Sequence, residues 1–168
     1  LAVLAGRAQD GPALVIAPTS VGSNWIEESR RFAPHLHRVL YRETDRDTVL
    51  GEFKAGDLVV ISYGLVLRDI EKLSQVRWNT LILDEAQFIK NSRTKTAQAI
   101  RGLQADWRIA LTGTPIENHL GELWSLFRAV SPGLFGGWER FREQFALPIE
   151  RDRSGDRRRA LARLVRPF

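Results

Sequence analysis

The sequence predicts an α/β fold, because short apolar runs alternate along the chain with stretches that have helical spacing. Four such runs occur, at residues 13–17, 58–61, 80–83 and 108–111. Their apolar residues are continuous rather than alternating, which is typical of strands buried on both faces of a parallel sheet. Strands that alternate with helices form βαβ units, whose right-handed crossovers cover the sheet with helices.

Two stretches between these runs have the spacing of amphipathic helices. In the first stretch four side chains share one face: Trp25, Ile26, Ser29 and Phe32. In the second, over residues 94–103, three side chains are expected to point inward: Ala97, Ile100 and Leu103. Four tryptophans lie beside apolar runs and are expected in the core: Trp78, Trp107, Trp124 and Trp138.

After Pro115 only helical spacing remains. A first apolar stripe ends at residues 131–133 and consists of Leu120, Leu123, Trp124 and Phe127. A second, expected to end near Pro148, consists of Trp138, Phe141 and Phe145. A third helix is expected over residues 157–165. We therefore expect a sheet-containing part at residues 1–115 and a helical extension at residues 116–168.

The composition is that of a globular chain of 168 residues, with 43% hydrophobic and 27% charged residues, which excludes a disordered tail or a coiled coil. No run of about 18 apolar residues occurs, so we expect no membrane partner. The lack of cysteine excludes disulfides and thiolate metal sites and fits a reducing cytoplasm. The excess of arginine over lysine is associated with GC-rich bacterial genomes.

The net charge of +5 is concentrated near the end of the chain. Seven arginines and three acidic residues lie between residues 150 and 168. Such a basic segment either attracts phosphate backbones or forms a solvated helix, and the sequence leaves both open.

The most informative motif is an acidic pair, Asp84 and Glu85, directly after the apolar run that ends at Leu83. A parallel strand would present both carboxylates at its carboxyl end, where open α/β sheets bind ligands. One carboxylate can hold Mg²⁺ through its water shell, and the other can orient an attacking water in a nucleoside triphosphatase. Alternatively, the pair is a set of solvated acids that open a helix.

Two further motifs follow predicted strands. Thr112 and Thr114 flank Gly113 after the run at residues 108–111, which fits either a hydrogen-bonded bridge to a nucleotide site or a polar turn. Residues 17–20, which read Ala-Pro-Thr-Ser, follow the first run, and Asn24-Trp25 lie one turn into the next helix. Hydroxyls at a helix N-terminus bind phosphate, or simply cap the helix.

Together, the series resembles the first motor lobe of superfamily-two helicase-like ATPases, most closely the Swi/Snf-like branch of DNA translocases. Five segments carry the main resemblance: residues 14–20 (motif Ia), 57–63 (motif Ib), 84–87 (the Asp-Glu-Ala-Gln box, motif II), 88–91, and 111–115 (motif III). Residues 116–118, 122–126 and 132–136 resemble a block that separates this branch from RNA helicases, and residues 166–168 resemble the start of the segment to a second lobe.

The resemblance implies a RecA-like fold, hydrolysis of ATP with Mg²⁺, and movement along double-stranded DNA by two lobes of one protein. Asp84 would serve the metal, and Glu85 the water. Conformational coupling would involve Gln87, Thr112, Gly113 and Thr114. The strand-tracking face would contain Pro18, Thr19, Ser20, Asn24, Trp25, Ser62 and Tyr63.

The sequence departs from this family pattern in one respect: it contains no Gly-Lys pair, whereas these ATPases have a phosphate loop that ends Gly-Lys-Thr. We therefore expect a piece of a longer protein that starts after the phosphate loop and ends before the second lobe. The isolated chain would be inactive and would self-associate through an open sheet edge. Two alternatives remain: an RNA helicase lobe, and a non-catalytic module that binds nucleic acid or protein.

Overall fold

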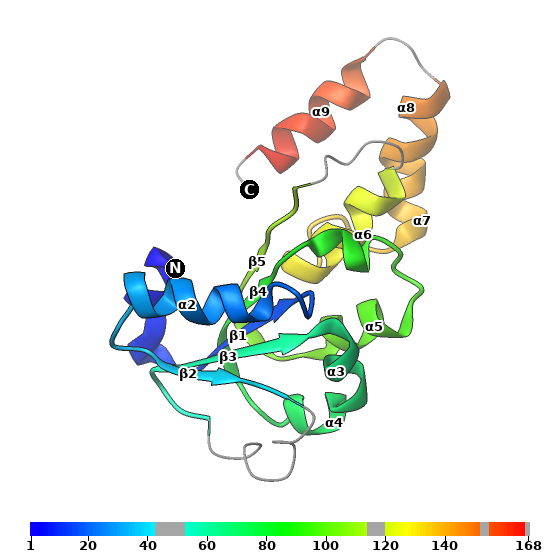
Figure 1. Cartoon of the computed structure of the whole chain (residues 1–168). Helices are drawn as coiled ribbons and strands as arrows, with labels where there is room; N and C mark the ends of the chain where they lie inside the picture. The colour runs from blue at the N-terminus through cyan, green and yellow to red at the C-terminus, as the bar shows by residue number, and fades with distance from the viewer. Residues whose placement is uncertain (43–52, 114–119, 152–154, 167–168) are drawn as a thin grey trace.

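A computed structural model describes residues 1–42, 53–113, 120–151 and 155–166. Its centre is a sheet of five parallel strands in the order β2-β3-β1-β4-β5 (Figure 1). The strands are β1 Ala13–Ala17, β2 His37–Leu40, β3 Asp57–Ser62, β4 Trp78–Leu83 and β5 Ala105–Ala110. The α/β prediction is confirmed.

Helices cover both faces of the sheet. One core contains α1 (Ala2–Arg7), the turn η1 (Ala8–Asp10) and α2 (Gly22–Phe32), packed on Val15 and its neighbours. The other lies under α3 (Tyr63–Arg68), α4 (Ile70–Leu73) and α5 (Lys95–Gly102), where Leu14 and Ile16 point. Since successive strand residues point to opposite faces, a continuous apolar strand supplies both cores.

The register of the central strands aligns their carboxyl ends. Ala17 of β1 is opposite Ser62 of β3, and Ile16 is opposite Leu83 of β4. The segments that follow these strands therefore leave the sheet side by side, at the edge where parallel sheets bind ligands.

A helical part follows the sheet. It consists of α6 (Leu120–Val130), α7 (Trp138–Phe141), the π-turn η4 (Arg142–Ala146), α8 (Leu147–Arg151) and α9 (Asp156–Val165). A third core, with Trp124, Phe135 and Phe141, holds it together. Figure 1 shows α6 against the sheet domain and α8 and α9 farther out. Two hydrogen bonds attach α6 to the sheet domain: Ser125 Oγ donates to Ile89 O over 2.7 Å, and Arg108 donates to Ala129 O over 3.0 Å. An ion pair between Lys90 and Glu122, at 3.2 Å, adds to them.

The structure corrects several details of the expected elements. β2 carried no strong apolar signal, because its residues are only partly buried at the sheet edge. β5 begins at Ala105 rather than near Arg108. The helical path does not end near Pro148 but continues to Arg151, since α8 follows the π-turn η4 without a break and Pro148 lies directly after that irregular turn.

Two aromatic side chains are more exposed than the sequence predicts. Trp107 is 38% exposed, because β5 is the edge strand of the described sheet and pairs only with β4. Phe32 is 57% exposed at the end of α2, with the Arg31 guanidinium over its ring. Within the described ranges, no helix is long and apolar enough to cross a membrane.

Candidate functional site

Asp84 and Glu85 lie at the carboxyl end of β4, in the turn before the short helix η3 (Ala86–Ile89). The Asp84 N–H donates to Ile16 O over 2.8 Å, which extends the β1–β4 ladder into the turn. Both oxygens of the Asp84 carboxylate accept hydrogen bonds. Oδ1 accepts from the Glu85 N–H over 3.0 Å, and Oδ2 accepts from the Trp25 indole N–H over 2.8 Å. The orientation of this carboxylate is therefore fixed from two sides.

Glu85 is held in an unusual backbone conformation. It has φ 50° and ψ 53°, and among the described residues it is the one non-glycine with positive φ. This left-handed conformation costs an L-residue roughly 1–2 kcal/mol. The next N–H, of Ala86, donates to Leu111 O over 2.8 Å, so the end of β5 fixes the turn. Strain that the surroundings maintain in this way is typical of functional sites.

A hydrogen-bonded chain connects the end of β5 to Glu85. Thr112 Oγ1 donates to Gln87 Oε1 over 2.9 Å, and Gln87 Nε2 donates to Glu85 Oε2 over 2.7 Å. The structure thus brings together Glu85, Gln87 and Thr112 from two of the predicted motifs. Gly113 is exposed directly after Thr112, and Thr114 lies outside the described residues.

Tyr63 contacts the turn that contains Asp84 and Glu85. Its side chain is buried, its hydroxyl donates to Asp84 O over 2.7 Å, and its ring stacks on Phe88 with the centroids 5.0 Å apart. Burial and the nearby charges of Asp84 and Glu85 raise the pKa of the Tyr63 hydroxyl. This contact could not be predicted from the sequence, because Tyr63 and Asp84 are brought together only by the neighbouring strands β3, β1 and β4.

The residues expected on the strand-tracking face fall into two groups. Pro18, Thr19 and Ser62 line a cavity of about 390 Å³ at the ends of β1 and β3. Ser20 and Asn24 are exposed on the same connection. Trp25 and Tyr63, in contrast, both direct polar atoms at Asp84. Ser62 also caps α3, since its Oγ accepts from the Leu65 N–H over 3.4 Å.

The arginines near the end of the chain are exposed wherever the structure describes them. They lie mainly on α9, whose polar surface carries Arg157, Arg158, Arg159 and Arg163. Arg159 pairs with Asp156 on the same helix.

The donor set at β4 is compatible with Mg²⁺. No group of three metal-ligating side chains occurs in the part of the chain that the structure describes. Mg²⁺ needs no such group, since it keeps several waters and is bound by one or two carboxylates together with substrate phosphates. The partly exposed carboxylate of Asp84 is such a ligand.

A parallel sheet between two layers of helices, with an acidic pair at the carboxyl end of a buried central strand, defines a RecA-like lobe. The model of one family, described as the SNF2-related domain, matches residues 2–168. The chain belongs to this family, as its motifs suggested.

Similar proteins with names are consistent with this family. The chain is 47% identical over 163 residues to YwqA of Bacillus subtilis (strain 168), whose name describes an ATP-dependent helicase/translocase, and 39% identical over 145 residues to the TATA-binding protein-associated factor MOT1 of Saccharomyces cerevisiae. The matches cover 95% and 85% of this chain but only 18% and 8% of the two relatives.

A solved structure has the same fold. The SWI2/SNF2 ATPase core of Sulfolobus solfataricus in complex with dsDNA superposes with a TM-score of 0.85 and is 38% identical. The match covers 99% of this chain and 35% of that one. The chain thus spans about a third of the solved core.

Proposed function

We propose that the chain is the first lobe of an ATP-dependent translocase that moves along double-stranded DNA. The observation that supports it best is the hydrogen-bonded chain from Thr112 through Gln87 to Glu85, beside an Asp84 carboxylate held by two donors. This arrangement joins the end of one strand to the acidic pair at the end of the next. A change at Thr112 would therefore move Glu85.

The residues would divide the work of ATP hydrolysis. Asp84 would hold Mg²⁺ through its water shell, and the ion, when bound, would neutralise the negative charge that develops on the transferred phosphoryl group of ATP. Glu85 would accept a hydrogen bond from the attacking water and orient it. Gln87 donates to Glu85 Oε2 and so holds this carboxylate in place. Thr112, Gly113 and Thr114 would transmit movement between the lobes.

Nucleic acid would bind at the ends of β1 and β3. Pro18, Thr19, Ser20, Asn24 and Ser62 would contact the phosphate backbone, so the contacts would not depend on base sequence. Trp25 and Tyr63 are proposed members of this face as well, although their polar atoms bond to Asp84. Double-stranded DNA, rather than RNA, is supported by the family and by the solved relative that contains dsDNA.

The remaining features of the proposal concern the whole protein. Residues 1–115 would form the RecA-like lobe and residues 116–168 a helical extension toward a second lobe. The outer edge of β5 would allow self-association. We place the protein in a bacterial cytoplasm, in line with the lack of cysteine and the relative from Bacillus subtilis.

ATPase stimulation tests this function in the protein that carries the chain. Duplex DNA of arbitrary sequence should stimulate hydrolysis strongly, and single-stranded RNA should not. Binding of duplex DNA should weaken steeply as salt rises, because phosphate contacts release counterions. Stimulation by RNA alone would indicate an RNA helicase, and an absence of ATP hydrolysis would favour a non-catalytic module.

A further inference from the structure

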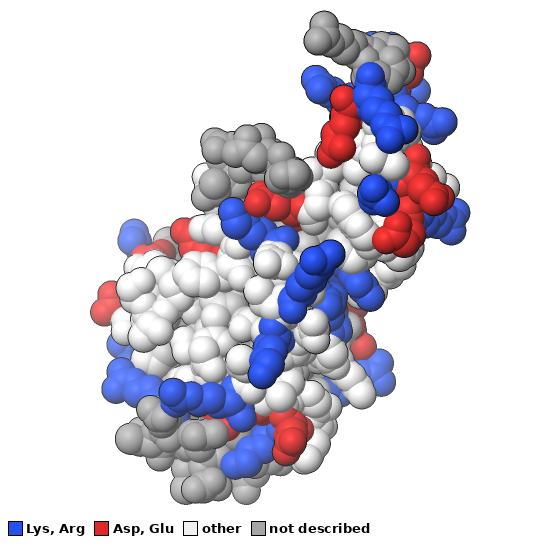
Figure 2. Space-filling model, turned by 90° about the vertical axis from the view of Figure 1, so that its right-hand side faces the viewer, with Lys and Arg blue, Asp and Glu red and all other residues white. Residues whose placement is uncertain are grey.

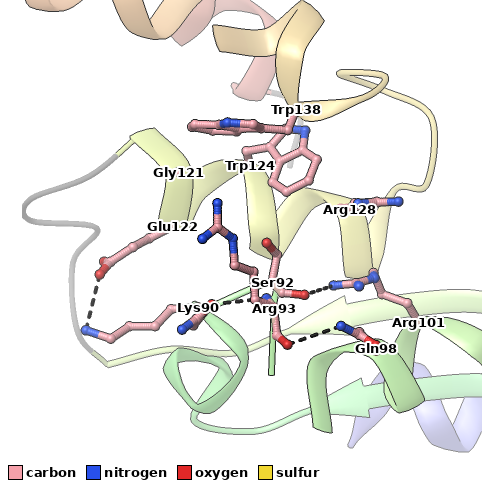
Figure 3. A pocket seen from close by; sticks show the side chains of 11 residues that line it. Lys90, Ser92, Arg93, Gln98, Arg101, Gly121, Glu122, Trp124, Arg128 and Trp138 are labelled. Atoms are coloured by element: carbon pink, nitrogen blue, oxygen red, sulfur yellow. Dashed lines mark hydrogen bonds and ion pairs between the residues drawn. The ribbon is translucent and has the colours of Figure 1, made fainter. Parts of the chain in front are cut away.

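A cavity of about 660 Å³ lies apart from the acidic pair, where the segment after η3 faces α5, α6 and α7. Lys90 and Arg93 come from that segment, Arg101 from α5, Arg128 from α6 and Trp138 from α7 (Figure 3). None of the residues proposed for hydrolysis lines it. The cavity is therefore a feature that the proposed motor chemistry does not explain.

The lining is strongly basic. It contains four basic side chains, those of Lys90, Arg93, Arg101 and Arg128, and a single acidic one. The acid, Glu122, forms an ion pair with Lys90 at 3.2 Å. Across the described ranges, none of the three arginines forms an ion pair with a carboxylate. Figure 2 shows basic side chains gathered between the sheet domain and the outer helices.

Two of these arginines lie close enough to repel each other. Arg101 donates to Ser92 O over 3.0 Å, which holds it in the wall, and Arg128 lies beside it on the same side of the cavity (Figure 3). Burial, and then repulsion by Arg128, lower the pKa of Arg101. An anion between the two guanidinium groups would remove this repulsion.

The other wall is aromatic and rigid. The Arg128 Cζ lies 5.0 Å from the centroid of the Trp124 ring, and Trp124 and Trp138 meet edge to face at 5.3 Å. The Trp124 indole N–H donates to Gly136 O over 3.2 Å. A guanidinium that stacks on an indole is preorganised and still offers N–H groups to a carboxylate.

We propose that this cavity binds an acidic peptide segment of a partner protein, with carboxylates on Arg93, Arg101 and Arg128 and a neighbouring apolar side chain against the partly exposed indole of Trp138. The pair between Lys90 and Glu122 shows that the lining already accepts a carboxylate. A peptide fits better than duplex DNA, because a duplex approaches through phosphates on a broad surface and would leave a hollow lined by indoles unfilled. Both aromatic and arginine side chains are typical anchors of protein interfaces.

The test measures binding of a fluorescent peptide, rich in Glu and Asp around one Phe, to the full protein that carries this chain. The same peptide with Gln and Asn in place of the acids is the ligand control. Arg128→Gln should weaken binding of the acidic peptide by about tenfold or more, since it removes charge-assisted hydrogen bonds from the centre of the site. Arg140→Gln on α7, an exposed residue outside the lining, makes the same charge change and should have little effect.

Glu122→Gln provides a variant whose expected effect cannot arise from misfolding. It removes the single acid of the lining and releases Lys90, so the acidic peptide should bind several-fold more tightly. Equal binding of the acidic and amide peptides, or equal effects of Arg128→Gln and Arg140→Gln, would overturn the proposal. So would a loss of duplex DNA affinity in Arg128→Gln with unchanged peptide binding, which would identify the cavity as a nucleic-acid contact.

Discussion

The Trp25 indole N–H donates to Asp84 Oδ2 over 2.8 Å, although the two residues are 59 positions apart in the sequence. Trp25 lies on α2, and Asp84 directly follows β4, an inner strand of the sheet. The helix that begins after β1 therefore reaches the proposed metal ligand. This contact connects the segment expected to follow DNA with the segment expected to act on ATP.

Trp25→Phe should impair the use of Mg²⁺ rather than the binding of DNA. The change keeps the aromatic ring but removes the donor, and hydrogen bonds to charged groups contribute about 1.5–3 kcal/mol. We expect a roughly tenfold decrease in kcat and an increase in the Mg²⁺ concentration for half-maximal ATPase activity. Trp107→Phe on the exposed edge of β5 is the control. A loss of DNA affinity with an unchanged Mg²⁺ requirement would instead support the strand-tracking role.

Glu85→Gln should abolish hydrolysis but not nucleotide binding. The amide preserves size, and Asp84 remains available for the metal, but the charge that orients water is lost. ATP turnover by the full protein should decrease at least ~10²-fold, as for other positioned acid–base groups. Glu71→Gln, an exposed glutamate on α4, is the matched control. Near-normal turnover of Glu85→Gln would mean that the water is oriented by another carboxylate.

Thr112→Val should separate basal from DNA-stimulated hydrolysis. Valine has the shape of threonine but cannot donate to Gln87 Oε1, so the connection from β5 to Glu85 is broken. Basal ATPase activity should change less than about threefold, whereas stimulation by duplex DNA should decrease about fivefold, because the interaction lost is a neutral hydrogen bond of about 1 kcal/mol. Thr96→Val on α5 should leave both rates unchanged. Equal losses of both rates in Thr112→Val would point to a purely structural role.

Tyr63→Phe should remove part of the pH dependence of stability at alkaline pH. The folded state raises the pKa of Tyr63, whereas an unfolded tyrosine titrates near pH 10. Above about pH 10 the unfolded chain loses this proton and the folded chain keeps it, so the free energy of unfolding decreases with rising pH. The slope contributed is at most ~1.4 kcal/mol per pH unit. Urea unfolding of both proteins at several pH values measures it, and parallel curves would contradict this assignment.

The buried centre of the fold could be predicted from the sequence, whereas its edges could not. β1, β3 and β4 are continuous apolar runs because both faces are covered, and this burial pattern is what the runs report. β2 and β5 lie at the edges of the sheet, where residues such as Arg38 and Trp107 need not be fully buried. The apolar run is therefore weak in β2, and in β5 it begins only after the strand has started.

The acidic pair could also be predicted, because it is local to one strand end. The residues that form hydrogen bonds with the pair could not be predicted. Trp25, Tyr63 and Thr112 reach Asp84 or Glu85, directly or through Gln87, from other elements. Their contacts depend on the strand order and the register, which a single sequence does not specify. Helical spacing placed Trp25 correctly on the inner side of α2 but carried no information about the bond that its N–H makes.

The outer edge of β5 should make the isolated chain self-associate. β5 pairs with β4 alone in the described sheet, and the Leu111 N–H donates to Leu83 O over 2.8 Å. Because ladder bonds alternate, the N–H groups of Arg108 and Ala110 face away from β4. Trp107 lies within β5 and Leu111 directly follows it, and their side chains are 38% and 42% exposed. Exposed apolar edges of this kind pair with strands of other molecules.

Ala110→Pro tests this edge with little damage to the sheet, since proline is tolerated where the N–H of an edge strand faces outward. Sedimentation of the original chain at tens of micromolar should show dimers or larger species, and Ala110→Pro should shift the distribution toward monomer. Ala162→Ser, on the exposed side of α9, is the control and should leave the distribution unchanged. A chain that stays monomeric, with the amide protons of Arg108 and Ala110 strongly protected from exchange, would mean that the edge of β5 is closed within one molecule.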